Sequence, residues 1–195
     1  MAMPALLPAS PFFRQDRACA TITGGLIFLL RPPAPLTMQT LAPSTSLAQA
    51  ADQSEIDALV RAFFSVFTNK NGARPEVDAI HRMFIPQGLI IKCHGDHREI
   101  YTLQQFIAPR LQLLTSGQLT DFQEQEVSAR TDIFGGIAQR YSVYEKSGVL
   151  DGQAFHAYGV KTLQLIRMED GWKMVSLAWE DERDGLGIPA QLKHS

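Results

Sequence analysis

Two residues with acid–base chemistry stand on alternate positions of one predicted strand. His156 and Tyr158 are two residues apart, and side chains alternate across a strand, so both lie on the same face. A histidine can accept a proton near neutral pH and a tyrosine hydroxyl can donate a hydrogen bond, so the pair suits acid–base catalysis. The competing interpretation places His156 in solvent at a hairpin end and Tyr158 in the sheet with its hydroxyl in water. We prefer this second interpretation for His156.

A second group of chemically active residues lies between two apolar segments. Cys93, His94, Asp96 and His97 are all of metal-ligand type. Their spacing matches no closed zinc motif, and neighbouring strand residues point to opposite faces, so the four side chains do not all converge. We therefore expect a solvated turn with no metal and no cofactor, and we keep His94 as a candidate acid–base residue.

Aromatic residues on several predicted elements indicate a pocket for a small molecule. An aromatic wall with a few polar tips is the usual composition of such a pocket. Packing of a helix on a sheet would explain the phenylalanines of the first helix without any ligand, and is the simpler interpretation for them. The residues expected to contact a ligand are Phe63, Tyr141, Tyr158 and Trp179.

The elements that must position these residues begin with helices. Apolar residues at i, i+3, i+4 and i+7 predict an amphipathic helix that ends at Asn71-Gly72. A short helix begins near Pro75, and a buried strand follows at 89–91. A third helix begins at the Thr102 capping box, and Pro109 should kink or break it. The stripe of the first helix consists of Ile56, Leu59, Val60, Phe63, Phe64 and Phe67, and its start can be capped by Asp52 with Glu55 or by Ser54 with Asp57.

The second half of the chain is predicted to be a run of long antiparallel strands. Glycine-containing pairs supply the positive φ angles of tight turns at Gly135-Gly136, Asp151-Gly152 and Asp170-Gly171. Helices followed by strands indicate an α+β fold, a cone-shaped barrel of a strongly curved antiparallel sheet wrapped around three N-terminal helices. One face of the sheet should line a cavity, and the other, also apolar, should form a homodimer. The strands are expected at about 119–131, 137–145, 155–167 and 172–180.

Composition and charge exclude some classes of partner. The chain has 195 residues, of which 45% are hydrophobic and 19% charged, so it can form one ordinary core. Its net charge of −2 is not that of a nucleic-acid-binding protein, which is expected to be basic. Cys19 and Cys93 lie in different parts of the chain and do not form a disulfide framework.

Residues 1–51 are predicted to be a leader outside the folded domain. The run Ala18–Leu30 is apolar and follows two arginines, as in a secretory signal, but it is too short for a stable membrane span. Ala48-Gln49-Ala50 would make a cleavage site, although a long proline-containing segment separates it from the apolar run. We prefer a disordered or non-native leader, with a start at Met38 and a cytoplasmic protein. The alternative is an exported or periplasmic precursor.

Three stretches of the chain resemble the nuclear transport factor 2-like superfamily, which also contains ketosteroid isomerase, scytalone dehydratase and SnoaL-type polyketide cyclases. The stretches are ADQSEIDALVRAFFSVF, TDIFGGIAQRYSVYE and HAYGVKTLQLIRMEDGWKMVSLAWEDE. The resemblance covers residues 52–184, which leaves 185–195 as a loose C-terminal tail. It implies the cone-shaped α+β barrel and frequent dimers, but not an activity, because this fold hosts enzymes and binding modules alike.

The catalytic set that the resemblance to ketosteroid isomerase would imply does not occur. That chemistry needs a carboxylate base after the first strand and a protonated acid as an oxyanion donor. This chain has Lys92 and Cys93 at the first position, and Thr162 and Gln164 where the second acid would lie. We therefore expect a small-molecule-binding domain for a hydrophobic or aromatic compound, without a recognisable catalytic set. The alternatives are an isomerase, dehydratase or cyclase that uses His/Tyr acid–base chemistry in the cone cavity, and a protein-binding domain.

Overall fold

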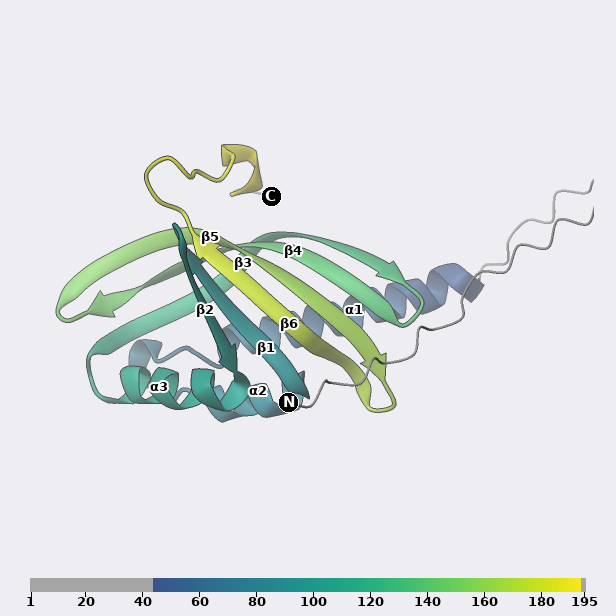
Figure 1. Cartoon of the computed structure of the whole chain (residues 1–195), viewed down its shortest axis with the longest axis horizontal. Coiled ribbons are helices and arrows are strands. Elements are labelled where there is room, and N and C mark those ends of the chain that lie inside the picture. The colour runs from purple at the N-terminus through teal and green to yellow at the C-terminus, as the bar shows by residue number, and fades with distance from the viewer. Residues whose placement is uncertain (1–43, 194–195) are drawn as a thin grey trace, which may run out of the picture. The chain divides into compact units, whose positions relative to one another are not determined.

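The computed structural model describes residues 44–193, which form a curved sheet with helices packed on one face (Figure 1). The helices are α1 (Ser44–Ser65), α2 (Ile80–Met83) and α3 (Leu103–Thr115), with short 3-10 turns at Lys70–Gly72, Val77–Ala79 and Ala190–Leu192. The strands are β1 (Phe84–His94), β2 (His97–Thr102), β3 (Leu119–Phe134), β4 (Ile137–Leu150), β5 (Gln153–Met168) and β6 (Gly171–Asp181).

Ala48-Gln49-Ala50 and the predicted end of the leader at residue 51 lie within helix α1 (Ser44–Ser65), which continues into the domain. Two other predictions about the leader fall on residues that lie outside this description. These are the start at Met38 and the signal-like run Ala18–Leu30, and both stay predictions. Within residues 44–193, none of the helices is both long enough and apolar enough to cross a membrane.

The sheet confirms the α+β class and corrects two details of it. The strand order is β2-β1-β6-β5-β4-β3, and β1 pairs parallel to β6 while every other pair is antiparallel. The sheet is therefore mixed and open, with β2 and β3 as its edges, and α3 lies between β2 and β3 in the chain. The sequence predicted a polar turn at residues 93–97 and no strand after it, because HREIYT is an exposed, charged edge strand with no buried face from which to predict β2.

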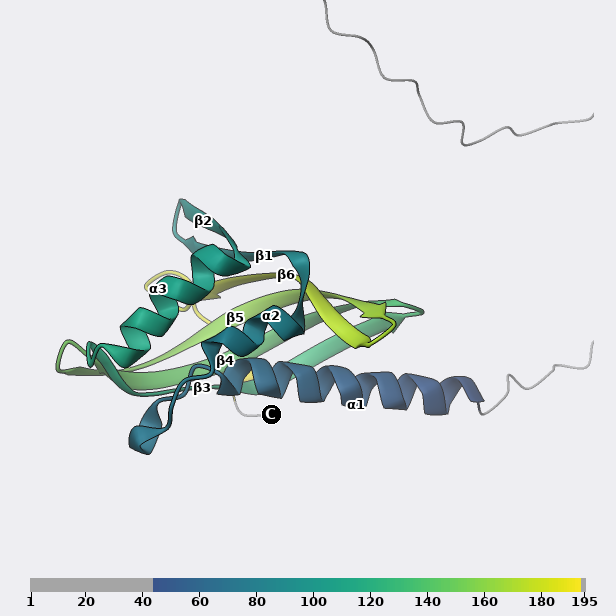
Figure 2. The same ribbon diagram turned by 90° about the horizontal axis from the view of Figure 1, so that it is seen from below.

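Irregular pairing bends the long strands around the helices. The register of β3 with β4 shifts between Thr120 and Gln123 and again between Glu126 and Ser128, and β5 shifts against β6 after Gln164. Extra residues of this kind increase local twist and bend a strand. Figure 2 shows the result from below, with α1 running along the sheet and α3 crossing near its other end.

Helix α1 confirms the predicted apolar stripe and begins earlier than expected. Its buried residues include Ile56, Val60, Phe63 and Phe64. The helix starts at Ser44 rather than near Asp52, which lies inside it and is buried. Asp52 and Glu55, expected to cap the helix, instead bind the first residues of β6. Trp172 Nε1 donates to Asp52 Oδ1 at 3.2 Å, and Trp172 N donates to Glu55 Oε1 at 2.9 Å.

Helix α3 keeps its predicted start and runs through its proline. The Thr102 side chain accepts from Gln105 N, and Gln105 Oε1 accepts from Thr102 N, which is the capping box expected from the sequence. The helix continues past Pro109 to Thr115, so the predicted break does not occur. Pro109 lies on the exposed side of the helix, where the carbonyl that loses its ladder bond can reach water.

The C-terminal segment corrects the expectation of a loose tail. Residues 185–193 fold back along the sheet, where Ile188 N donates to Glu182 Oε1 at 3.0 Å and Lys193 Nζ lies 2.7 Å from Glu182 Oε2. Ser128 Oγ donates to Leu192 O at 2.5 Å, which fixes the end of the segment to β3. These contacts place the segment on the convex face, away from the helices.

Candidate functional site

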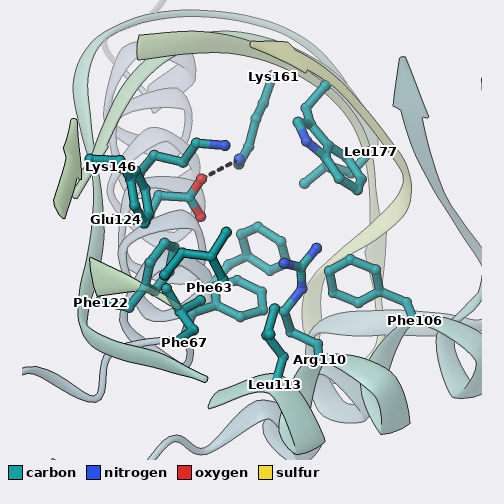
Figure 3. Close-up of a pocket in the computed structure, with 14 residues that line it drawn as sticks. Phe63, Phe67, Phe106, Arg110, Leu113, Phe122, Glu124, Lys146, Lys161 and Leu177 are labelled. Atoms are coloured by element: carbon teal, nitrogen blue, oxygen red, sulfur yellow. Dashed lines mark hydrogen bonds and ion pairs between the residues drawn. The ribbon is translucent and has the colours of Figure 1, made fainter. Parts of the chain in front are cut away.

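A cavity of about 320 Å³ lies between helices α1 and α3 and the concave face of strands β3 to β6 (Figure 3). Most of its wall is aromatic or aliphatic, and a minority of charged side chains enters from the sheet and from α3. The lining residues are Phe63, Phe67, Phe106, Arg110, Leu113, Leu119, Phe122, Glu124, Lys146, Leu150, Phe155, Lys161, Leu177 and Trp179.

The apolar part of the cavity is a connected set of aromatic rings. Phe67 packs edge to face on Phe63 with centroids 5.3 Å apart and on Phe106 at 6.1 Å. Phe106 in turn meets the ring of Trp179 at 5.9 Å. Because α1, α3 and β6 each contribute to this set, its rings hold the cavity walls at a fixed spacing.

Strand alternation carries Lys161 into this apolar environment. Lys161 shares the concave face of β5 with Leu163 and Leu165, and all three side chains are buried. The Lys161 Nζ donates to Glu124 Oε1 at 2.7 Å and lies 3.5 Å from the centroid of the Tyr144 ring. Burial lowers the pKa of Lys161, and the neighbouring Glu124 carboxylate offsets only part of that effect.

A second ion pair lies beside the first. Lys146 Nζ donates to both carboxylate oxygens of Asp181 at 2.7 Å, and Tyr144 OH donates to Asp181 Oδ1 at 2.5 Å. Burial alone would raise the pKa of Asp181, but the charge of Lys146 and the two hydrogen bonds outweigh it and hold the pKa below its ordinary value. Burial and the nearby carboxylates raise the pKa of Tyr144, so its hydroxyl stays a donor at any physiological pH.

A glycine opposite Tyr144 makes room for this arrangement. Tyr144 and Gly159 are direct partners across β4 and β5. A Cβ atom at position 159 would lie 2.8 Å from the Glu180 carbonyl oxygen and closer still to the Tyr144 hydroxyl. Only glycine lets the phenol lie across the strand toward Asp181.

Arg110 is the remaining charged group of the cavity. It is half-buried on α3, and its guanidinium carbon lies 5.2 Å from the centroid of the Phe106 ring. Figure 3 shows its side chain pointing from α3 into the cavity, with Lys146 and Lys161 on the opposite wall. Among residues 47–193, no carboxylate forms an ion pair with Arg110.

The structure separates the ligand-contact residues expected from the sequence. Phe63 and Trp179 line the cavity. Tyr141 lies on the convex face, where 44% of it is exposed. Tyr158 is on the same face, beneath the Lys193 ammonium at 4.7 Å from its ring centroid.

The two candidate acid–base histidines lie outside the cavity. His156 Nε2 is 3.3 Å from Glu145 Oε2, and its ring meets that of Tyr158 at 5.0 Å, on the exposed convex face. His94 is exposed at the end of β1 and faces His97 across the hairpin. Among the residues the structure describes, no group of three His, Cys, Asp or Glu side chains is placed to hold a metal ion.

The sequence interpretation missed the charged residues of the cavity. The signal for Lys161 was present, because a lysine occupies the same strand face as Phe155, Leu163 and Leu165. Glu124 likewise shares a face with Phe122 on β3. Alternation shows which residues share a face, but not which face the helices cover.

Comparisons of the whole fold identify its relatives in structure. The chain matches a nuclear transport factor 2-like protein with a cystatin-like fold from Novosphingobium aromaticivorans at 14% identity, covering 80% of this chain and 97% of that one, with a TM-score of 0.58. It matches a candidate aromatic ring hydroxylase of the same organism at 15% identity, with 69% and 91% coverage and a TM-score of 0.58. A nuclear transport factor 2 superfamily protein from Salmonella enterica matches at 13% identity, with 72% and 99% coverage and a TM-score of 0.57.

These likenesses show the fold. The chain has the nuclear transport factor 2-like, cystatin-like architecture predicted from its three sequence stretches. No protein-family model and no curated protein matches the sequence. The chemistry must therefore be argued from the cavity itself.

Proposed function

We propose that this protein binds a small, largely apolar or aromatic molecule in the cavity between α1, α3 and the concave sheet. The observation that carries the proposal is the aromatic cavity of about 320 Å³ with a few charged groups on its wall. That composition is typical of small-molecule sites, and the volume is at the lower end of their usual range of about 300–1,000 Å³. A ligand with one or two rings is the best match.

The buried ion pairs support a role for the cavity beyond packing. Removing charges from water is costly, and apolar residues of similar size are often as stabilising as a buried pair. The buried pair Lys161–Glu124 nevertheless lies on the cavity wall, and the half-buried pair Lys146–Asp181 lies beside it. A ligand with a polar end could form hydrogen bonds with these ion pairs, which would explain charged residues that packing alone does not require.

The enzyme alternative has less support in the form expected from the sequence. It relied on His94, or on His156 with Tyr158, and these residues lie outside the cavity. The name of one structural neighbour, a candidate aromatic ring hydroxylase, is in keeping with an aromatic ligand. If a reaction occurs in the cavity, its proton carriers are Lys161 and the two carboxylates that line or adjoin it.

A cavity-filling variant tests the proposal directly. Leu113 lines the cavity from α3, so Leu113→Trp should lower the affinity for a neutral aromatic probe such as 2-naphthamide by at least about tenfold, which corresponds to 1.4 kcal/mol. Gln112→Trp, at an exposed position of the same helix, is the matched control and should bind as the wild type does. Isothermal titration calorimetry provides the measurement. Equal affinities of the two variants and the wild type, or no binding to any of them, would contradict the proposal.

We also propose that the convex face forms a homodimer, as expected from the sequence. This face exposes Tyr141 and Leu89 to 44% and 41% in the single chain. Sheet faces with exposed apolar residues are typical of self-association in two-fold symmetric dimers. Sedimentation velocity on the wild type and on Tyr141→Glu tests this. We expect a dimer and a monomer respectively, and a monomeric wild type would overturn the proposal.

A further inference from the structure

The charges around the cavity do not balance without a further anion. Lys161 is neutralised by Glu124 and Lys146 by Asp181, each at 2.7 Å. Arg110 faces these pairs from α3 and lies over the Phe106 ring, and none of the carboxylates within residues 47–193 forms an ion pair with it. The cavity therefore has three cations, Arg110, Lys146 and Lys161, around it. Its two carboxylates, Glu124 and Asp181, already form ion pairs with the lysines.

A half-buried cation without a counter-ion is costly in a site with aromatic walls. Arginine cannot lose its proton in a protein, so it cannot relieve that cost by becoming neutral. The planar guanidinium also offers paired N–H donors in a fork that fits a carboxylate, and it can stack on an aromatic ring while it does so. The position of Arg110 over Phe106, with its tip in the cavity, matches this use.

We propose that the ligand of this cavity is an aromatic carboxylate whose carboxylate group is bound by Arg110. This inference rests on the proposed function, that the cavity binds a small aromatic molecule. The ring of the ligand lies among Phe63, Phe67 and Trp179, and its anionic group lies against α3. Glu124 and Asp181 stay paired with their lysines and exclude a second negative charge from the opposite wall.

The test compares three probes of the same size and shape. 2-Naphthoate is anionic, 2-naphthamide is neutral, and 2-naphthylmethylammonium is cationic. Because hydrogen bonds to a charged partner contribute about 1.5–3 kcal/mol, we expect the anion to bind roughly 10-fold to 100-fold more tightly than the amide. The ammonium should bind more weakly than either probe. Titration calorimetry at low and high salt should show the preference for the anion falling as the salt concentration rises.

Variants of Arg110 separate ligand recognition from a structural role. Arg110→Met should abolish the preference for 2-naphthoate and leave the affinity for 2-naphthamide within about threefold. Arg110→Lys should keep part of the preference, because it keeps the charge but not the fork. Arg61→Met, at an exposed position of α1, removes one positive charge from the surface and should change nothing. The melting temperature of Arg110→Met should equal or exceed that of the wild type, since an uncompensated cation is lost.

The outcomes distinguish failure of this inference from failure of the proposed function. Equal binding of the anion and the amide to the wild type would overturn the carboxylate inference and leave the binding function intact. An unchanged preference in Arg110→Met would overturn the role of Arg110. Binding of none of the probes would overturn both proposals.

Discussion

Glu124 and Glu126 lie on one face of β3 but in different surroundings, one on the cavity wall and the other beneath helix α1. Glu126 accepts from Arg140 Nε at 2.9 Å and from Arg140 Nη2 at 2.5 Å. Arg140 Nη1 also donates to Asp57 Oδ1 on α1 at 2.7 Å, so this cluster joins the helix to the sheet. Glu124, two residues earlier, accepts from Lys161 alone, on the wall of the cavity.

The difference lies in what covers each cluster. Helix α1 lies over Arg140, whose side chain is only 6% exposed and has hydrogen-bond partners on α1 and β3. Lys161 and Glu124 lie where α1 and α3 diverge and a cavity remains. The same types of charged residue thus hold the fold together at one end of the sheet and form a candidate ligand site at the other.

The largest expected effect is on the cluster that α1 covers. Arg140→Met would leave Glu126 and Asp57 without their shared cation, so we expect a loss of about 4 kcal/mol in the free energy of unfolding. Urea unfolding measures this. Arg130→Met, which breaks the exposed pair with Asp132 on the same sheet, is the matched control and should cause no measurable change. Similar losses in both variants would mean that the two clusters do not differ as described.

The cavity pair should respond differently to single and double substitution. Lys161→Met alone would leave Glu124 without a partner and cost about 3 kcal/mol of unfolding free energy. Lys161→Met combined with Glu124→Leu should recover to within about 1 kcal/mol of the wild type, because apolar residues suit the aromatic surroundings. Urea unfolding of the two variants and of Glu124→Leu completes the cycle. No recovery in the double variant would assign this pair a structural role like that of Arg140.

A packing change at the glycine opposite Tyr144 should have an intermediate effect. Gly159→Ala places a methyl group against the Tyr144 hydroxyl and the Glu180 carbonyl, which should cost about 2 kcal/mol. Gly148→Ala, on the neighbouring strand, is a milder comparison because its nearest contacts are 3.2 Å or longer. Thermal unfolding of the two variants checks the order. An equal loss in both would argue against close packing of Tyr144.

The smallest effect concerns acid stability. The pKa of Asp181 is lower in the folded protein than its ordinary value of 3.8, so the folded state binds fewer protons than the unfolded state near that pH. The stabilisation is therefore complete above the ordinary pKa and is lost as the pH falls through the folded-state pKa. Asp181→Asn should lower stability at pH 7 by less than the substitutions above, and the difference from the wild type should vanish once the pH lies below the folded-state pKa. Denaturant unfolding at several pH values measures the difference, and a gap that persists in acid would contradict this origin.

The sequence predicted the elements far better than the site. The apolar stripe that begins at Ile56 and the Asp151-Gly152 and Asp170-Gly171 turns are local patterns, and the structure contains the corresponding helix and hairpins, although the helix ends at Ser65 rather than at Asn71-Gly72. Lys161 was overlooked because alternation alone cannot tell the cavity face from the convex face. Arg110 was overlooked because its possible role as an anion-binding residue depends on which charged residues face it across the cavity, and the sequence does not show this.

Some sequence predictions were wrong because the residue types suited a local interaction, whereas the structure places these residues in contact with a distant part of the chain. Asp52 and Glu55 have the types and spacing of a helix cap, yet both accept hydrogen bonds from Trp172, at the start of β6. His156 and Tyr158 do share a strand face, but it is the convex one, which the sequence could not identify. In each case the decisive partner is more than a hundred residues away or on another layer.

The bond from Asp52 to Trp172 spans 120 residues and has a consequence for synthesis. As the chain leaves the ribosome, α1 emerges long before the β5–β6 turn on which it docks. Its apolar stripe of Ile56, Val60 and Phe63 therefore cannot be fully covered until the final hairpin has been made. Contacts of such separation slow folding and leave a nascent chain open to aggregation. Helix α1 is translated before every strand of the sheet and is thus among the last elements that can complete its packing.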